Sequence, residues 1–232
     1  MTIIFGIVRD EYAILGADTR ITYLPETEPS YYNDNAVKLA MFNGGWVAGA
    51  GSAAFIDNFN EITSSRLIVG VDDIDRMFID MLNGNGHLNT TNANDHLLDN
   101  TQIAYLFTYA NDQGHPDMHI ETLHCILGRR GLSGKNKFFS FGHSEDQVSI
   151  VNSYQSKINH EQNFVTTLKN CAAFVEDISL VNQSVSPFCD IGILIKESNE
   201  QVGFLRIREH SSTIINDNNP LEFAHNVYRL TK

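Results

Sequence analysis

The chain begins with MTIIFGIVRDEYAILGADTRIT (residues 1–22). Within it, Thr2–Val8 and Tyr12–Ala17 are rich in Ile, Val, Phe and Tyr, and the polar Arg9–Glu11 separates them, which is the pattern of a β-hairpin. Both runs carry apolar residues at successive positions rather than at alternate ones. We therefore expect these strands to lie in a sheet that is covered on both faces.

The rest of the chain alternates between groups of strands and pairs of helices. Strands are predicted at residues 36–42, 46–50, 102–109, 117–125, 137–141, 190–196 and 201–207, and helices at about 52–67, 71–82, 145–158 and 161–181. This order predicts an α+β fold in which two sheets pack face to face with helices outside, a four-layer αββα sandwich. Residues 1–232 are expected to form one domain, with a loop at 23–35 and an exposed polar excursion at about 83–101.

Composition and charge exclude several classes of protein. Apolar residues make up 42% of the 232 residues and charged residues 19%, which indicates a folded globular chain. A net charge of −12 with only 16 Lys and Arg predicts no nucleic-acid partner, because phosphate binding needs clustered cations. No apolar run approaches the roughly 20 residues that cross a bilayer, so no membrane association is expected. Cys125, Cys171 and Cys189 lack metal-ligand spacing and fit reduced thiols, which favours a cytoplasmic location.

Thr2 directly follows Met1, and a methionine before a small residue is the usual substrate of co-translational trimming. Removal of Met1 would leave a threonine that carries a hydroxyl nucleophile and a free α-amino group on one residue. With a pKa of about 8, the amine can accept the hydroxyl proton at neutral pH. This is the N-terminal threonine version of the nucleophile-and-base arrangement.

Four segments extend the pattern around Thr2. They are residues 1–8 (MTIIFGIV), 14–22 (ILGADTRIT), 36–39 (AVKL) and 48–54 (AGAGSAA). Together they resemble the amino-terminal third of proteasome β subunits, which are N-terminal-nucleophile (Ntn) hydrolases, in the style of the bacterial proteasome-type peptidases. Asp18 stands 16 residues after Thr2, as the family's Ala-Asp-(Ser/Thr)-Arg motif stands after its nucleophile.

The resemblance implies a role for each of these residues. Thr2 would attack an amide carbonyl and form an acyl-enzyme ester that water hydrolyses. Lys38 would lower the pKa of the Thr2 hydroxyl, and Asp18 would pair with Lys38 and fix its position. The main-chain N–H of Gly51 would stabilise the oxyanion beside a helix N-terminus. The alternatives are a strand-end turn residue for Asp18, a solvated surface cation for Lys38 and a simple turn for Gly51.

The second half of the chain departs from the family pattern, which has a Gly-Ser-Gly turn and an Asp-x-x-Ser-Gly-Gly segment. Phe141–Ser144 (FGHS) stands at the first place and Ser184–Cys189 (SVSPFC) at the second. The candidates for a supporting shell are Arg20, which completes the Ala-Asp-Thr-Arg motif, and His143, Ser144 and Asp190. These departures leave open a divergent proton network or an inactive subunit.

The resemblance also implies a pocket for the side chain that precedes the scissile bond. Its walls would be Ile21, Ala36, Gly49, Ala53 and Asp57. Gly49 would leave room for a side chain, and Asp57 would attract a basic one. The alternative for Asp57 is a position on the surface of a helix.

By resemblance, the chain is a threonine-type endopeptidase that hydrolyses peptides or unfolded proteins. It would assemble into a ring or other closed homo-oligomer, fed by a separate ATP-dependent unfoldase. The alternatives are an Ntn amidase that acts on small acyl-amides and a catalytically inactive ring subunit.

No cofactor and no metal are expected. His115, His119, His124 and Cys125 are close in sequence, which is the one cluster that would suggest zinc. On a strand, however, His119 and His124 differ by an odd number of residues and point to opposite faces.

Overall fold

The computed structural model describes residues 2–23, 31–65, 71–82, 101–110, 112–113, 115–124, 130–197 and 201–229. Its strands form two main antiparallel sheets and a small hairpin. The first sheet has the spatial order β10 (Phe139–Phe141), β1 (Ile4–Val8), β2 (Tyr12–Asp18), β11 (Phe188–Lys196), β12 (Val202–His210) and β13 (His225–Arg229). The second sheet has the order β5 (Leu39–Phe42), β6 (Gly45–Ala50), β7 (Gln102–Ala110), β8 (Pro116–His124) and β9 (Arg130–Ser133), and β3 (Ile21–Tyr23) pairs with β4 (Tyr31–Asn33).

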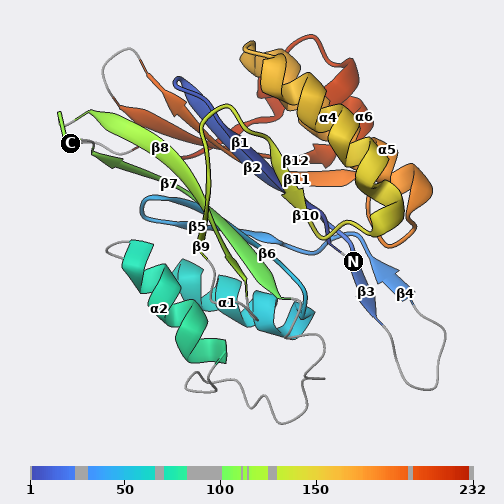
Figure 1. The fold of residues 1–232 in the computed structure, drawn as a ribbon, viewed down its shortest axis with the longest axis horizontal. Helices are drawn as coiled ribbons and strands as arrows, with labels where there is room; N and C mark the ends of the chain where they lie inside the picture. The colour runs from blue at the N-terminus through green and yellow to red at the C-terminus, as the bar shows by residue number, and fades with distance from the viewer. Residues whose placement is uncertain are drawn as a thin grey trace.

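The helices fall into two groups on opposite sides of the strands (Figure 1). One group comprises α1 (Ala53–Ser65) and α2 (Val71–Leu82), and the other comprises α4 (Val148–His160), α5 (Phe164–Val181) and α6 (Ser211–Asn216). Among the described residues, the 3-10 turns η2 (Glu145–Gln147) and η3 (Pro220–Phe223) precede α4 and β13. In the described part of the chain, no helix has the length and hydropathy that a bilayer crossing needs.

Three apolar clusters hold these elements together. The inner cluster joins the two sheets and includes Ile4 and Leu15 from the first sheet and Trp46 and Leu106 from the second, all fully buried. Gly192 lies against the Trp46 ring, which occupies the space that a β-carbon would need. Burial of each large apolar side chain contributes about 1.5–3 kcal/mol, so this cluster stabilises the contact between the sheets.

The two outer clusters join each sheet to its helices. On the first sheet, Phe5 of β1 packs edge to face against Phe174 of α5, with ring centroids 6.1 Å apart. On the second, Phe55 of α1 and Phe78 of α2 belong to the cluster that covers Tyr105 of β7.

Alternation along β1 explains why its sequence is apolar throughout. Ile4 and Val8 belong to the inner cluster, whereas Phe5 and Ile7 belong to the outer one. The prediction that this hairpin lies in a sheet covered on both faces is confirmed.

The mixed α and β composition with antiparallel sheets is also confirmed, but several boundaries differ. Residues 31–33, predicted to be part of a loop, form β4, and β5 begins at Leu39 rather than at Ala36 because the Ala36 N–H donates to the Thr19 carbonyl (3.1 Å). Strands β9 and β13 and helix α6 were not predicted. Residues 83–100 of the predicted excursion lie outside the described residues, and its last residue, Thr101, is fully buried.

Candidate active site

Asp18, the last residue of β2, is fully buried, and its carboxylate accepts four hydrogen bonds. Oδ1 accepts from the Ile3 N–H at 2.8 Å and from Lys38 Nζ at 3.0 Å. Oδ2 accepts from the N–H groups of Arg20 at 2.9 Å and Ser186 at 3.2 Å. Because burial of a carboxylate is costly unless it is paired and hydrogen-bonded, these donors offset the loss of its hydration. One carboxylate therefore connects four separate parts of the chain.

Lys38 lies immediately before β5, with only 4% of its surface exposed. Its ammonium forms a salt bridge to Asp18 with an N–O distance of 3.0 Å. Burial lowers the pKa of Lys38, while the carboxylates of Asp18 and Asp34 act in the opposite direction. Lys38 therefore releases its proton more readily than a solvated surface lysine does.

Thr2 lies two residues before the first residue of β1, Ile4, and is partly exposed. The next residue, Ile3, is bound to Asp18 twice, because its carbonyl also accepts from the Asp18 N–H at 3.2 Å. Gly142, which follows β10, approaches the Thr2 carbonyl oxygen so closely that a β-carbon at position 142 would collide with it. Gly142 also has a φ of +82°, which favours glycine. A turn from the second half of the chain thus abuts the backbone of Thr2.

Gly51 stands between β6 and α1 with a φ of +120°, and a β-carbon there would collide with Thr101. Thr101 Oγ1 accepts from the Ser52 N–H at 3.2 Å, and Ser52 Oγ caps α1 by accepting from the Phe55 N–H at 3.4 Å. The positive end of the α1 dipole therefore adjoins the Gly51 turn.

The β5–β6 register relates this turn to Lys38. Leu39 pairs with Ala48, so Lys38 and the residues that follow Ala48 lie at the same end of the hairpin. The lysine and the Gly51 turn are thus brought to one edge of the second sheet.

Arg20 forms a bidentate salt bridge with Asp34, in which Nη2 lies 2.7 Å from Oδ2 and Nε binds Oδ1. Its Nη1 donates to the Gln183 carbonyl, and its guanidinium lies 4.9 Å from the centroid of the Tyr32 ring. The hydrogen bonds from Arg20 hold the pKa of Asp34 below its ordinary value. Arg20 thereby ties β4 and the end of α5 to the strand end that carries Asp18.

Ser186 is a residue of this cluster that the sequence does not signal. It is fully buried, its N–H donates to Asp18, and its Oγ accepts from the Phe188 N–H at 3.1 Å. In the sequence, its segment is visible only as a departure from the family's Asp-x-x-Ser-Gly-Gly pattern. Ser186 lies near Asp18 because β11 pairs with β2. The sequence contains no periodic pattern that indicates which strands are paired.

The other candidates from the second half have different surroundings. Ser144 precedes η2, and its N–H donates to Gln147 Oε1 at 3.0 Å. Burial lowers the pKa of His143, whose Nδ1 is buried without a hydrogen-bond partner among the described residues.

Asp190 is fully buried and accepts from Arg206 Nε at 2.8 Å and Nη2 at 2.6 Å. Arg206 Nη2 also donates to the Leu39 carbonyl at 3.2 Å, so Asp190 takes part in a contact between the two sheets.

A cavity of about 620 Å³ lies beside Lys38, between β5, α1 and β3. Ile21, Ala36 and Asp57 line this β5–α1 cavity, and Glu61 adds a second carboxylate one helical turn after Asp57. Burial raises the pKa of Asp57, and the charge of Lys38 opposes this effect.

The two remaining predicted pocket residues differ from these. Gly49 lies against the side chain of Ile56 in α1, which fills the space where a β-carbon would stand. The side chain of Ala53 lies outside the described part of the structure.

The described residues contain no group of His, Cys, Asp or Glu side chains arranged to hold a metal ion. Cys171 and Cys189 are free and buried, and burial raises the pKa of both thiols. Cys125 lies outside the described residues.

No protein-family model matches the chain, and no curated protein matches it. Its fold is similar to two solved structures of Anbu from Hyphomicrobium sp. strain MC1. The Gly-1 mutant of Anbu is 16% identical with a TM-score of 0.58, and the alignment covers 93% of each chain. A second Anbu structure is 13% identical with a TM-score of 0.58, over 92% of each chain. At these identities the likeness concerns the fold alone.

Proposed function

We propose that the chain is a threonine-type Ntn hydrolase with the four-layer αββα architecture of that class, and that it cleaves peptide bonds with Thr2 once Met1 has been removed. The observation that carries the proposal is the shared oxygen of Asp18, which accepts from both the Ile3 N–H and Lys38 Nζ. It brings a buried lysine next to the residue that follows Thr2. A strand-end aspartate that only completed a turn would not need this partner.

In the proposed first step, Thr2 Oγ attacks the scissile carbonyl carbon, and its proton passes to the Thr2 α-amine. Lys38 stabilises the developing negative charge on Oγ and keeps the amine neutral by repulsion. Asp18 acts as a positioning residue through Lys38 and Ile3. The Gly51 N–H and the N-terminus of α1 stabilise the oxyanion.

In the second half of the reaction, the α-ammonium returns its proton to the leaving nitrogen as the C–N bond breaks. Thr2 then carries the acyl group as an ester. Water attacks the ester carbonyl, its proton passes to the α-amine, and the bond from the carbonyl carbon to Oγ breaks. The free Thr2 hydroxyl is regenerated when the amine returns the proton to Oγ.

Asp57 and Glu61 favour a basic side chain before the scissile bond, because both carboxylates border the β5–α1 cavity. The setting that we propose is a cytoplasmic ring or other closed homo-oligomer that receives peptides or unfolded proteins, with an ATP-dependent unfoldase as partner. In such a chamber the sites would be hidden from folded proteins.

The decisive experiment joins intact-mass analysis with covalent labelling. Purified protein whose amino terminus is shown by mass to be Thr2 is treated with a peptide epoxyketone, which reacts with both the hydroxyl and the amine of an N-terminal threonine. We expect stoichiometric labelling of the wild-type chain and none of Thr2→Ala. Labelling that persists in Thr2→Ala contradicts the proposal, and an unlabelled wild-type chain with free Thr2 favours the inactive ring subunit.

A substrate panel at fixed enzyme concentration separates the peptidase from an amidase. Faster turnover of peptides than of small acyl-amides supports the peptidase, and the reverse order supports the amidase.

A further inference from the structure

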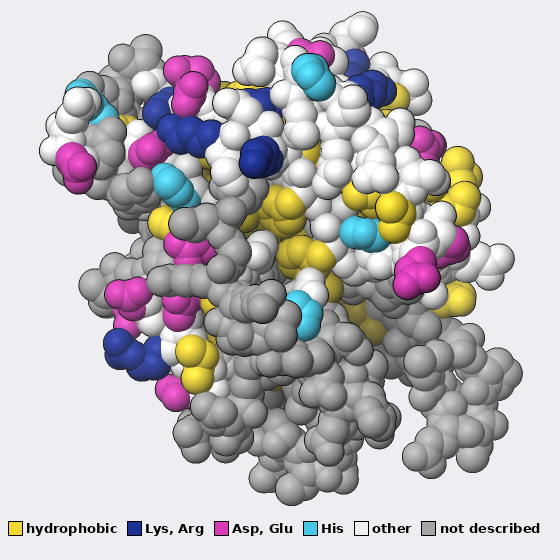
Figure 2. All heavy atoms as spheres, in the orientation of Figure 1, with side chains coloured by type: hydrophobic (Ala, Val, Ile, Leu, Met, Phe, Trp, Pro, Cys, Tyr) yellow, Lys and Arg dark blue, Asp and Glu magenta, His cyan; other side chains and the backbone are white. Residues whose placement is uncertain are grey.

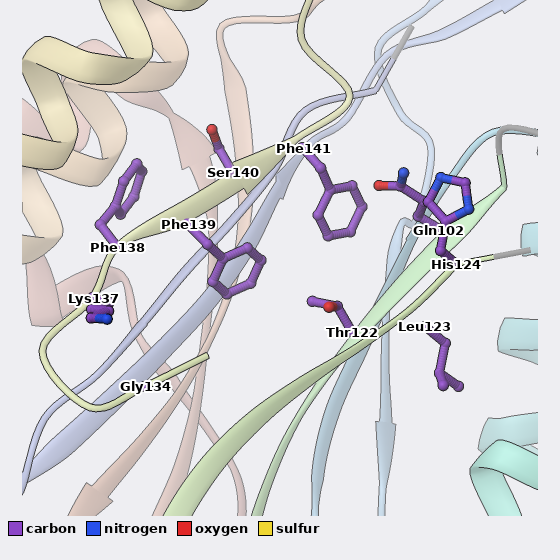
Figure 3. Close-up of a pocket in the computed structure, with 10 residues that line it drawn as sticks. All are labelled: Gln102, Thr122, Leu123, His124, Gly134, Lys137, Phe138, Phe139, Ser140 and Phe141. Carbon is purple, nitrogen blue, oxygen red and sulfur yellow. The ribbon is translucent and has the colours of Figure 1, made fainter. Parts of the chain in front are cut away.

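A second cavity, of about 500 Å³, lies between β10 of the first sheet and β8 of the second (Figure 3). We refer to it as the β8–β10 cavity. Figure 3 shows the rings of Phe139 and Phe141 turned toward Thr122 and His124, while Leu123 points away. The two rings are stacked, with centroids 6.0 Å apart and an interplanar angle of 20°. Hydrophobic side chains also gather near the middle of the face shown in Figure 2, between the two groups of helices.

One wall of the β8–β10 cavity leads to the nucleophile. Phe141 pairs with Ile4 in the β1–β10 ladder. The next residue, Gly142, is the one that abuts the Thr2 carbonyl oxygen. The Phe141 end of the cavity therefore adjoins Thr2.

The other wall leads to the Gly51 turn. Gln102 lines the cavity and pairs with Ala50, the last residue of β6. It directly follows Thr101, whose side chain and backbone adjoin Gly51. Both walls thus end at groups that would act on the scissile carbonyl.

The strand order separates the two cavities. In the second sheet, β6 lies between β5 and β7. The β5–α1 cavity borders the β5 side, and the β8–β10 cavity borders the β7 and β8 side. They therefore flank the Gly51 turn, as the two halves of an amide substrate would flank its scissile bond.

The two cavities also differ in charge. Asp57 and Glu61 border the β5–α1 cavity, whereas the described residues that line the β8–β10 cavity include Lys137 and no carboxylate. In a chain with 28 acidic residues, this contrast predicts opposite preferences for charge. The stacked phenylalanines favour an aromatic occupant over a small one.

We infer that the β8–β10 cavity binds the leaving side of the amide substrate and selects an aromatic residue directly after the scissile bond. The inference rests on the proposed function of Thr2. It also implies that an aromatic amine bound there competes with water for the acyl-enzyme. In that transfer the amine nitrogen bonds to the ester carbonyl carbon, the bond from that carbon to Thr2 Oγ breaks, and a proton moves from the amine to Oγ.

The test measures how the acyl-enzyme partitions between water and added amines, using protein that begins with Thr2 and reacts with the epoxyketone. Phenylalanine amide, glycine amide and lysine amide serve as acceptors for one peptide ester substrate. For the wild-type chain, we expect phenylalanine amide to capture the acyl group about tenfold more efficiently than glycine amide, the effect of roughly one aromatic contact. Lysine amide should be the poorest acceptor.

Two variants change the cavity in opposite ways. Phe141→Ala removes an aromatic wall, and Thr122→Phe fills the space, so each should bring phenylalanine amide close to parity with glycine amide, measured as a capture ratio for the fraction of protein that the epoxyketone labels. Leu180→Ala, at a position 78% exposed on α5, is the matched control and should retain the tenfold preference. Normal labelling with equal capture of both amides by the wild-type chain overturns this inference and leaves the proposed function standing. Absence of labelling overturns the proposed function itself.

Discussion

Asp18 Oδ1 lies 2.8 Å from the Ile3 nitrogen and 3.0 Å from Lys38 Nζ, so one buried oxygen joins the amino-terminal strand to the lysine. A displacement of either donor changes the position of the carboxylate that holds the other. The geometry around Thr2 and the electrostatics of Lys38 are therefore coupled. In a buried environment this charge pair interacts more strongly than it would in water.

Replacement of Lys38 by Ala should abolish most of the activity and also destabilise the fold. The expected loss of activity is about 100-fold or more, the effect of removing one electrostatic stabiliser. The variant leaves a buried carboxylate without its cation, so the free energy of unfolding should fall by about 3 kcal/mol. Epoxyketone labelling rates and urea denaturation measure the two effects. Lys157→Ala, at an α4 cation that lies over the Tyr154 ring, is the control and should change neither appreciably.

Replacement of Asp18 by Asn should shift the pH dependence of activity. Asp18 raises the pKa of Lys38 against the lowering effect of burial, so its removal should lower that pKa further. If the charged lysine is the active form, the alkaline limb of the pH–rate profile moves to lower pH. A profile with an unchanged alkaline limb would show that the charge of Lys38 does not limit the reaction.

Replacement of Gly142 by Ala should impair both activity and stability. A β-carbon at position 142 collides with the Thr2 carbonyl oxygen, and the φ of +82° is unfavourable for alanine. The strain should lower the free energy of unfolding by about 1–3 kcal/mol, and the shift of Thr2 should slow labelling by at least tenfold. Gly44→Ala is the matched control, because its β-carbon would meet only ordinary contacts, at 3.5 Å or more. Equal labelling rates in the two variants would contradict a close fit at Thr2.

The salt bridge between Arg20 and Asp34 should make stability depend on acid pH. The pKa of Asp34 is lower in the folded chain than in the unfolded chain, so the unfolded chain binds more protons as the pH falls below about 4. This contribution to stability is complete above the unfolded pKa and is lost as the pH falls through the folded pKa. Asp34→Asn should therefore unfold more easily than wild type at pH 6, with a smaller difference at pH 3. Urea midpoints at the two pH values measure it, and a constant difference would exclude the linkage.

Asp57 should control the preference for the residue before the scissile bond. Fluorogenic peptides ending in Arg should be cleaved faster than those ending in Leu or Tyr, and Asp57→Asn should reduce that ratio. Burial raises the pKa of Asp57, so its carboxylate takes up a proton at a higher pH than an exposed aspartate does. As the pH falls, the preference for Arg should therefore begin to weaken at that higher pH. Equal cleavage of the Arg and Leu peptides by the wild-type chain would refute the assignment.

Local patterns predict the amino-terminal hairpin well, because its pairing depends on residues close in sequence. Apolar residues at successive positions of β1 indicate a strand buried on two faces, and Ile4 and Phe5 do belong to opposite clusters. The family resemblance names Asp18 and Lys38, and the structure places their side chains 3.0 Å apart.

Contacts that depend on pairing between strands distant in the sequence cannot be predicted from local patterns. Ser186 reaches Asp18 only because β11 pairs with β2. Arg206 of β12 binds Asp190 of the neighbouring strand β11. A sequence motif does not show this salt bridge, so Asp190 appears in the sequence as a candidate for the supporting shell of the active site. Strand β4 has only three residues, and its partner β3 (Ile21–Tyr23) is equally short, so neither strand is long enough to show a periodic pattern in the sequence.

The place of β1 in the first sheet has a consequence for the order of events during synthesis. Its two neighbours are β2 and β10, and β2 in turn pairs with β11, so residues 139–141 and 188–196 complete the sheet around the amino-terminal hairpin. Until the ribosome has made those residues, the first strand lacks one neighbour and Asp18 lacks the Ser186 donor. Under the proposed function, Thr2 is therefore translated before the residues that complete its surroundings, so removal of Met1 would precede assembly of the site.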